Sequence, residues 1–267
     1  MKQQNKISAL IITYNEMGYI EKCIESIAFA DEIIVVDSYS TDGTYEFLVE
    51  HPKVKVIQHP FSNFTAQKAF TLKQAANDWV LFLDADEVVS KKLKTEITTT
   101  VNSNNTKEAY WFYRKFMFQN KALNYSGWQT DKNYRLFRKS KATFCNKRIV
   151  HETLNIDGAT GKLKNKLDHY CYKNYSVYKN KVKLYGQLKA LEAFNKNRKF
   201  NYLLLAIKPS WKFLFNYFIR LGILDGKKGL TICYLDALGE VERYQKLRQL
   251  EVESRQLSNI QIKALSK

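Results

Sequence analysis

Short apolar segments alternate with helical patterns through the first 90 residues, and this alternation limits the fold more than any other feature. The predicted strands are 7–13, 32–36, 54–58 and 79–83, and the predicted helices between them are 17–29, 41–49 and 65–77. Strands that are apolar on both faces must be covered on both sides, which is typical of a parallel sheet flanked by helices. The first half therefore predicts an α/β fold.

The pattern changes after about residue 90. Residues 91–102 read as a surface helix, and 110–118 and 134–137 read as aromatic strands. From about residue 175 the chain becomes helical, with predicted helices over 177–197, 202–221 and 229–254, and Pro209 is expected to start or kink the second of them. We expect two domains, 1–172 with the sheet and 173–267 as a basic, aromatic helical annex.

The charge is distributed unevenly between the two parts. The chain has 43 Lys and Arg against 26 Asp and Glu, a net charge of +17. Residues 1–100 hold 10 Lys and 14 acidic residues, a balance of −4, so the remaining 167 residues carry +21. This asymmetry argues against a uniformly basic nucleic-acid binder, and no nucleic-acid partner is predicted.

Four dispersed cysteines and the absence of a signal-peptide pattern indicate reduced thiols in a cytosol. The most apolar stretch, 202–224, is interrupted by charged residues and Pro209, so no spanning helix is predicted. The sequence does not indicate an oligomeric state.

Leu83-Asp84-Ala85-Asp86-Glu87 follows a predicted buried strand and is the strongest chemical signal. Ligands of open parallel sheets bind at the carboxyl ends of the strands. Two carboxylates one residue apart can hold Mg²⁺ or Mn²⁺, which in turn can bridge the phosphates of a substrate. A solvated acidic turn is the alternative interpretation.

Two further strands end in polar residues. The second predicted strand ends in the segment Val36-Asp37-Ser38-Tyr39-Ser40-Thr41-Asp42-Gly43-Thr44, which contains Asp37. The first predicted strand ends in Thr13-Tyr14-Asn15-Glu16. A carboxylate at Asp37 can accept a hydrogen bond from a base or a ribose, whereas Asp42 is expected to cap a helix. Three strands thus deliver polar side chains to one predicted edge.

These motifs, in this order, resemble the nucleotide-sugar-binding half of family 2 glycosyltransferases, which have a GT-A fold. The segment from Gln67 to Asp86 is similar too, with Lys68 where the family commonly has Arg. Later elements resemble the bacterial lipopolysaccharide-core β-glucosyltransferase subgroup: Gly127-Trp128, Asp131, Arg135-Leu136-Phe137-Arg138, Val150-His151-Glu152, His169-Tyr170, Asp225-Gly226 and Arg243-Tyr244. The similarity covers about residues 7–250.

The resemblance implies an inverting transfer of a sugar, with glucose the leading candidate, from a UDP-sugar to a glycan or glycolipid acceptor. It implies donor contacts from Thr13, Asn15, Glu16, Asp37, Lys68, Asp84, Ala85, Trp128, Arg135 and Arg138, and metal ligands among Asp84, Asp86 and His169. His151 is a further candidate for the metal or the diphosphate. Each His, Trp128 and each Arg also has a purely structural interpretation.

The general base has two candidates. Many family members have a Glu-Asp pair after the metal motif, but no such pair follows residue 87 here. An inverting transfer needs a carboxylate near the acceptor hydroxyl. Glu152, beside His151, is the first candidate and Asp131 the second, and an ion pair with a nearby cation is the structural alternative for Glu152.

Residues 198–228 interleave aromatic and aliphatic side chains with Lys and Arg. Such a segment can lie at an anionic membrane surface or can pack on the sheet domain. We expect a cytoplasmic enzyme that is peripheral on the inner face of the plasma membrane. The rival functions are a nucleotidyltransferase, which usually has a Gly-rich phosphate loop, and a non-enzymatic RNA-binding protein.

Overall fold

The computed structural model describes residues 4–118, 121–145, 153–172 and 175–265. The chain forms two compact units. The first comprises Met1–Phe116 and Thr130–Cys171, and the second comprises Met117–Gln129 and Tyr172–Lys267. Each unit is described separately below.

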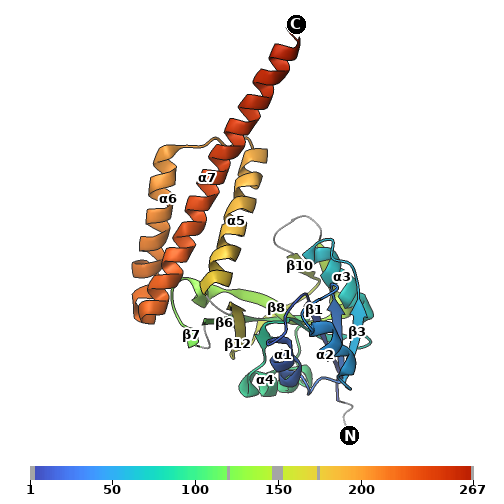
Figure 1. Ribbon diagram of the computed structural model, residues 1–267. Helices are drawn as coiled ribbons and strands as arrows, with labels where there is room; N and C mark the ends of the chain where they lie inside the picture. The colour runs from blue at the N-terminus through green and yellow to red at the C-terminus, as the bar shows by residue number, and fades with distance from the viewer. Residues whose placement is uncertain (1–3, 119–120, 146–152, 173–174, 266–267) are drawn as a thin grey trace. The chain divides into compact units, whose positions relative to one another are not determined.

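The first unit begins with alternating strands and helices (Figure 1). Its strands are β1 (Ile7–Thr13), β2 (Glu32–Asp37), β3 (Val54–Gln58), β4 (Trp79–Asp84), β5 (Glu87–Val88), β6 (Ala109–Phe118), β8 (Lys132–Arg138), β9 (Ala142–Cys145), β10 (Thr153–Ile156), β11 (Thr160–Lys162) and β12 (Leu167–Tyr172). Its helices are α1 (Ile20–Ser26), α2 (Thr44–Glu50), α3 (Phe64–Gln74) and α4 (Lys91–Val101). The last residues of β6 and β12 belong to the second unit.

The main sheet has the strand order β3-β2-β1-β4-β8-β6-β12-β5. Strands β1 to β4 pair in parallel, whereas β8 runs antiparallel to both β4 and β6. Strands β9 and β10 form a separate antiparallel pair. The parallel half therefore directs the carboxyl ends of β1, β2 and β4 to one edge of the sheet.

Both faces of the parallel half are buried. One apolar cluster joins alternate residues of β1 and β4 to α1, α2 and α4, with Ile24, Leu48 and Leu93 fully covered. The other joins Leu10, Val36 and Phe82 to Leu72 on α3. Helices thus cover both faces, and the α/β fold predicted from the alternating pattern is confirmed.

The second unit is mainly helical. It contains β7 (Lys121–Leu123), α5 (Tyr175–Asn195), α6 (Tyr202–Leu214), a π-helical segment (Phe215–Ile219), a 3₁₀ turn (Gly222–Asp225) and α7 (Gly226–Leu265). Helices α5 and α6 lie along α7 (Figure 1). Within the described residues, no helix combines the length and the apolar character that a membrane span requires.

Two details of the second unit differ from the sequence prediction. Helix α6 begins at Tyr202, after its cap Asn201, and continues through the buried Pro209, so this proline does not start a helix. Residues 117–129 also belong to this unit, although they precede the last strands of the sheet.

Candidate functional site

The ends of β1, β2 and β4 bring the predicted donor-binding residues to one level of the sheet. Thr13 pairs with Asp37, and Ile12 pairs with Asp84. The buried side chain of Thr13 and the half-buried side chain of Asp84 therefore follow neighbouring strands at the same edge. This is the edge at which open parallel sheets bind their ligands.

The loops after β1 and β2 hold each other in place. The Asn15 amide oxygen accepts a hydrogen bond from Thr41 N at 2.8 Å, and Asn15 N donates to Ser40 Oγ at 2.9 Å. Glu16 N donates to Thr44 Oγ1 at 3.0 Å. Asn15 and Tyr39 both have positive φ, 56° and 62°, a costly conformation that is found mainly where the surrounding structure enforces it.

Asp37 is fully buried, and its carboxylate organises the second of these loops. Its Oδ1 accepts from Ser40 Oγ at 2.5 Å, and its Oδ2 accepts from Ser40 N at 3.0 Å. Asp42 Oδ1 accepts from Thr44 N at 3.1 Å, but the N-cap of α2 is Gly43 and no side chain caps this helix, so the predicted capping role of Asp42 is not confirmed. Contact between Asp37 and a nucleotide stays a prediction.

Asp84 lies between two cations. Lys68 Nζ on α3 is 3.2 Å from Asp84 Oδ1, and Arg135 on β8 ion-pairs with Oδ2. Burial opposes the ionisation of Asp84, but the charges of Arg135, Lys68 and Arg114 outweigh it and hold the pKa of Asp84 well below its usual range. The Asp84 carboxylate is therefore charged throughout the physiological pH range.

Glu87 extends this network into the protein interior. It is fully buried, and its Oε1 lies 2.5 Å from Arg135 Nη2 and 3.2 Å from Arg114 Nη1. Its Oε2 accepts a hydrogen bond from Asp84 N at 2.9 Å. Arg114 also contacts Asp131, with 2.7 Å between Nη2 and Oδ2. Three carboxylates and three cations thus fix the shape of this edge.

Asp86 points to a different set of partners. Its Oδ1 lies 3.4 Å from His169 Nε2, and Cys171 Sγ lies 2.9 Å from His169 Nδ1. Single ligand atoms of Asp86, His169 and Cys171 lie within 4.8 Å of one another, so these residues form a chemically suitable set for a divalent metal ion. Burial, followed by the negative charges of Asp86, Glu16 and Cys171, raises the pKa of the neighbouring Tyr19 to about 12.

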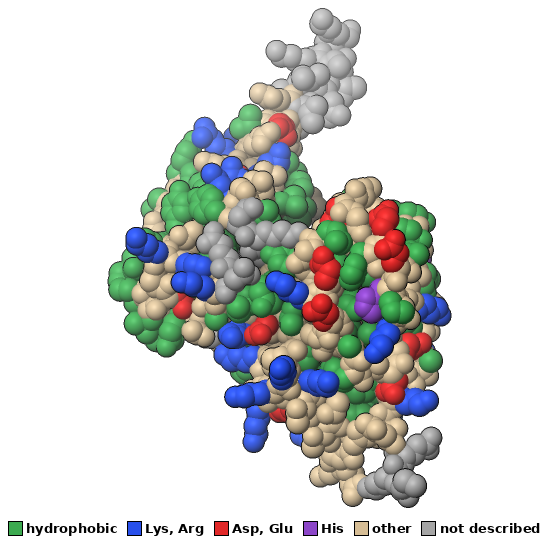
Figure 2. All heavy atoms as spheres, turned by 60° about the horizontal axis from the view of Figure 1, so that its bottom comes forward, with side chains coloured by type: hydrophobic (Ala, Val, Ile, Leu, Met, Phe, Trp, Pro, Cys, Tyr) green, Lys and Arg blue, Asp and Glu red, His purple; other side chains and the backbone are tan. Residues whose placement is uncertain are grey.

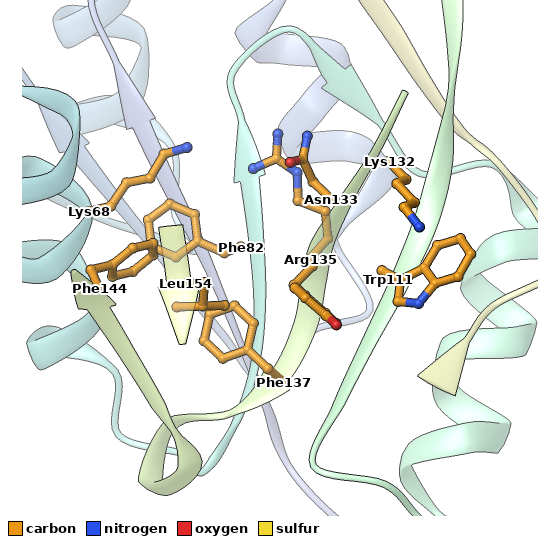
Figure 3. A pocket seen from close by; sticks show the side chains of 10 residues that line it. Lys68, Phe82, Trp111, Lys132, Asn133, Arg135, Phe137, Phe144 and Leu154 are labelled. Carbon is orange, nitrogen blue, oxygen red and sulfur yellow. The ribbon is translucent and has the colours of Figure 1, made fainter. Parts of the chain in front are cut away.

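Lys68 and Arg135, the two cations that ion-pair with Asp84, also line a pocket of about 290 Å³ (Figure 3). Its lining consists of aromatic and aliphatic side chains with three cations and one amide: Lys68, Phe82, Trp111, Lys132, Asn133, Tyr134, Arg135, Phe137, Phe144 and Leu154. The volume suits a small ligand. Apolar rings together with hydrogen-bond donors can hold a single sugar ring.

Several predicted residues do not meet at this edge. Arg138 pairs with Trp79, the first residue of β4, whereas Asp84 is the last. Arg138 stacks on the Trp79 ring and ion-pairs with Asp78 and Glu108, so the structure separates it from the site. Ala85 is buried behind the edge.

Three other candidates are not among the residues described at this edge. Trp128 belongs to the second unit. Glu152 and His151 lie outside the described residues. Of the predicted metal ligands, the structure brings Asp86 and His169 together, while Asp84 binds Lys68 and Arg135 instead.

Two members of the site, Arg114 and Cys171, were not predicted from the sequence. Arg114 links Glu87 to Asp131, and its position as the first Arg of the chain was the available signal. Cys171 lies two residues after His169, and side chains two apart on a strand share a face. That spacing pointed to a pair of ligands.

Comparison with known proteins identifies the family. The model of the family "Glycosyl transferase family 2" matches residues 8–154, which extend from β1 into the first residues of β10 and include the ends of β1, β2 and β4. This chain is a family 2 glycosyltransferase. The resemblance inferred from the sequence motifs and the predicted enzyme class are both confirmed.

Relatives of this glycosyltransferase match it over nearly its whole length. An uncharacterized glycosyltransferase of Rickettsia typhi is 31% identical over 261 residues, covering 94% of this chain and 89% of the relative. One from Rickettsia bellii is 32% identical over 259 residues, covering 93% and 88%. The lipopolysaccharide core biosynthesis glycosyltransferase LpsC of Rhizobium meliloti is 26% identical over 250 residues, covering 89% and 93%.

Among solved structures, residues 1–349 of S. aureus TarS in complex with UDP resemble this chain with a TM-score of 0.49 and 17% identity. That similarity covers 94% of this chain and 91% of the TarS chain.

Proposed function

We propose that this glycosyltransferase moves a sugar, with glucose the first candidate, from a UDP-sugar to a hydroxyl of a cell-envelope glycan. The observation that carries the proposal is the alignment of Asp37 and Asp84 at one sheet edge, next to the Asp86–His169 pair. In this assignment the β1 and β2 loops receive the nucleoside. Lys68 and Arg135 set the position and charge of Asp84, and the pocket beside them receives a sugar ring.

Asp86 and His169 are the residues that would hold a divalent ion, Mg²⁺ or Mn²⁺. Their carboxylate oxygen and imidazole nitrogen lie 3.4 Å apart, so a small adjustment would let both contact one ion. When bound, such an ion stabilises the negative charge of a leaving diphosphate. Asp84 then contacts the donor as a charged carboxylate that its ion pairs hold in place.

The chemical step that we propose is a direct displacement. The acceptor oxygen bonds to the anomeric carbon as the bond from that carbon to the diphosphate oxygen breaks, and a carboxylate takes the hydroxyl proton. An α-linked donor then gives a β-linked product. Glu152 is our first candidate for the base and Asp131 the second, because Arg114 already contacts Asp131 Oδ2 at 2.7 Å.

The base assignment is tested with a pair of matched variants, Glu152→Gln and Asp131→Asn. We expect Glu152→Gln to lower kcat by about 10²-fold or more, with donor KM nearly unchanged, because the group acts only in the chemical step. Asp131→Asn should raise KM or reduce stability, since it loosens Arg114. The opposite ranking of the two kcat values would assign the base to Asp131.

The acceptor that we propose is an anionic, lipid-linked glycan, such as a lipopolysaccharide core, met at a membrane surface. LpsC, which is similar over most of this chain, is described as acting in lipopolysaccharide core biosynthesis. The second unit has a matching surface, because α6 and the π-helical segment expose one stripe at helical spacing: Leu203, Ile207, Trp211, Leu214 and Phe218. Lys208, Lys212 and Arg220 accompany it, and Figure 2 shows hydrophobic and basic side chains intermixed on this unit.

A further inference from the structure

Cys171 belongs to a cluster with three different ligand chemistries. A carboxylate oxygen of Asp86, a ring nitrogen of His169 and the Cys171 sulfur lie within 4.8 Å of one another. His169 is buried, and its Nε2 lies 3.4 Å from Asp86 Oδ1 and 3.0 Å from Cys171 Sγ. The cluster belongs entirely to the first unit.

Backbone pairing brings these three residues together. Strand β12 runs antiparallel to β5, with His169 opposite Glu87 and Asp168 opposite Val88. Tyr170 N donates to the Asp86 carbonyl at 2.8 Å, which ties the strand to the turn that carries Asp86. Because alternate residues of a strand share a face, His169 and Cys171 present their side chains to the same side. The cluster is therefore set by strand register.

We propose that Cys171 is a thiolate ligand of the metal ion that Asp86 and His169 hold, so that the site favours Zn²⁺ or Co²⁺ over Mg²⁺. The proposal rests on the metal position assigned under the proposed function. Thiolate is a soft ligand that Mg²⁺ does not select, whereas mixed oxygen, nitrogen and sulfur sets suit Zn²⁺ and Co²⁺.

The geometry is compatible with this ligand set. Bonds of about 2.0–2.3 Å in a tetrahedral zinc site place ligand atoms about 3.3–3.8 Å apart. The 3.4 Å between Asp86 Oδ1 and His169 Nε2 falls in that range, Cys171 Sγ lies slightly closer to the same nitrogen at 3.0 Å, and all three ligand atoms lie within 4.8 Å of one another. Binding would displace the thiol proton of Cys171 into solvent.

The test is a Co²⁺ titration of the metal-free full-length protein, followed by absorption spectroscopy. We expect wild type to show a sulfur-to-cobalt charge-transfer band in the near ultraviolet, which Cys171→Ser abolishes. Loss of the thiolate should weaken Co²⁺ and Zn²⁺ binding by about tenfold or more and leave Mg²⁺ binding nearly unchanged. Cys233→Ser, which removes a buried thiol of the second unit, is the matched control and should retain the band.

A wild-type titration without the band, with equal Co²⁺ affinity in Cys171→Ser, would overturn the inference. Should Cys171→Ser fail to fold, X-ray absorption of zinc-loaded wild type decides, because a sulfur scatterer at about 2.3 Å is required. Shells of oxygen and nitrogen alone would contradict the thiolate. If wild type still transfers sugar with a bound metal and no sulfur ligand, the proposed function stands and only this inference fails.

Discussion

Arg135 is the buried cation on which the carboxylates of the candidate site depend. It bridges Asp84 on β4 and Glu87 on β5, and its own side chain is almost completely covered. Removing one partner of a buried ion pair leaves the others charged and uncompensated. Arg135 therefore contributes to stability and also fixes the position of Asp84.

We predict that Arg135→Met lowers the free energy of unfolding by about 3–5 kcal/mol, the usual cost of breaking a buried pair. Arg138→Met is the matched control on the same strand. Its partly exposed ion pairs with Asp78 and Glu108 should contribute only about 1 kcal/mol in total. Urea denaturation measures both, and equal losses would show that the Asp84–Arg135–Glu87 network adds no special stability.

The sequence predicted the location of those site residues that lie at the ends of strands. Asp37 and Asp84 each follow an apolar run, so their common edge could be expected. The burial of Asp37 by Ser40 and the separation of Arg138 from Asp84 depend on loop conformation and strand register, which a single sequence does not reveal. Arg114 was missed for the same reason, since its partner Glu87 lies on another strand. Cys171 shares β12 with His169, so its contact could have been expected from their spacing, but its closeness to Asp86 depends on the pairing of β12 with β5.

Among the elements, α7 contains a partly buried carboxylate, that of Asp236, which joins three helical segments. Asp236 Oδ1 accepts from Tyr178 Oη on α5 at 2.6 Å, and Oδ2 accepts from Asn216 Nδ2 of the π-helical segment at 3.1 Å. Burial raises the pKa of Asp236 in spite of these hydrogen bonds. The folded helical unit therefore binds a proton more tightly than the unfolded chain does.

This linkage has a definite sign. An unfolded Asp has a pKa of about 3.9, so stability from the protonated form is complete below that pH and is lost as pH rises through the elevated folded value. We predict that the wild-type free energy of unfolding, minus that of Asp236→Asn, falls as pH rises across this window and is constant above it. Denaturant titrations at a series of acidic pH values measure the difference, and a difference that rises with pH would contradict the assignment.

The elements themselves were predicted well where hydrophobic period and length agree. The parallel strands follow directly from apolar runs, whereas the caps of α3 and α4, Asn63 and Ser90, were not predicted. Of the two roles predicted for Pro209, starting a helix is excluded, because the residue lies buried inside α6. The assignment of residues 117–129 to the helical unit depends on long-range contacts such as Ser126 Oγ donating to Asp225.

Across the whole molecule, acidic and basic residues are concentrated in different parts of the chain. Residues 1–100, with a balance of −4, contain Asp37, Asp84 and Asp86, whereas the strongly basic remainder includes the exposed stripe of α6. Each Lys or Arg near an anionic membrane contributes about 1 kcal/mol of attraction. The basic helical unit is thus suited to the membrane contact that we propose.

We predict that the full-length protein sediments with vesicles containing anionic lipid, but much less with neutral ones, and that added salt releases it. Trp211, with 60% of its surface exposed, should shift its fluorescence to the blue on binding. Replacing Leu203 and Ile207 together by Glu should abolish sedimentation, whereas Leu184→Glu, at an exposed apolar position of α5, should not. Equal binding by all three proteins would refute the α6 surface.

The central claim is that the edge formed by β1, β2 and β4 binds a UDP-sugar through a metal ion held at Asp86. The most direct measurement is calorimetric titration of UDP-glucose into wild type and Asp86→Asn, each with Mn²⁺ and with a chelator. We predict that wild type binds the donor with Mn²⁺ and loses about tenfold or more in affinity with chelator or in Asp86→Asn, while both proteins keep the same circular dichroism spectrum. Equal donor affinity in all four titrations, or no binding by wild type with Mn²⁺, would contradict the account.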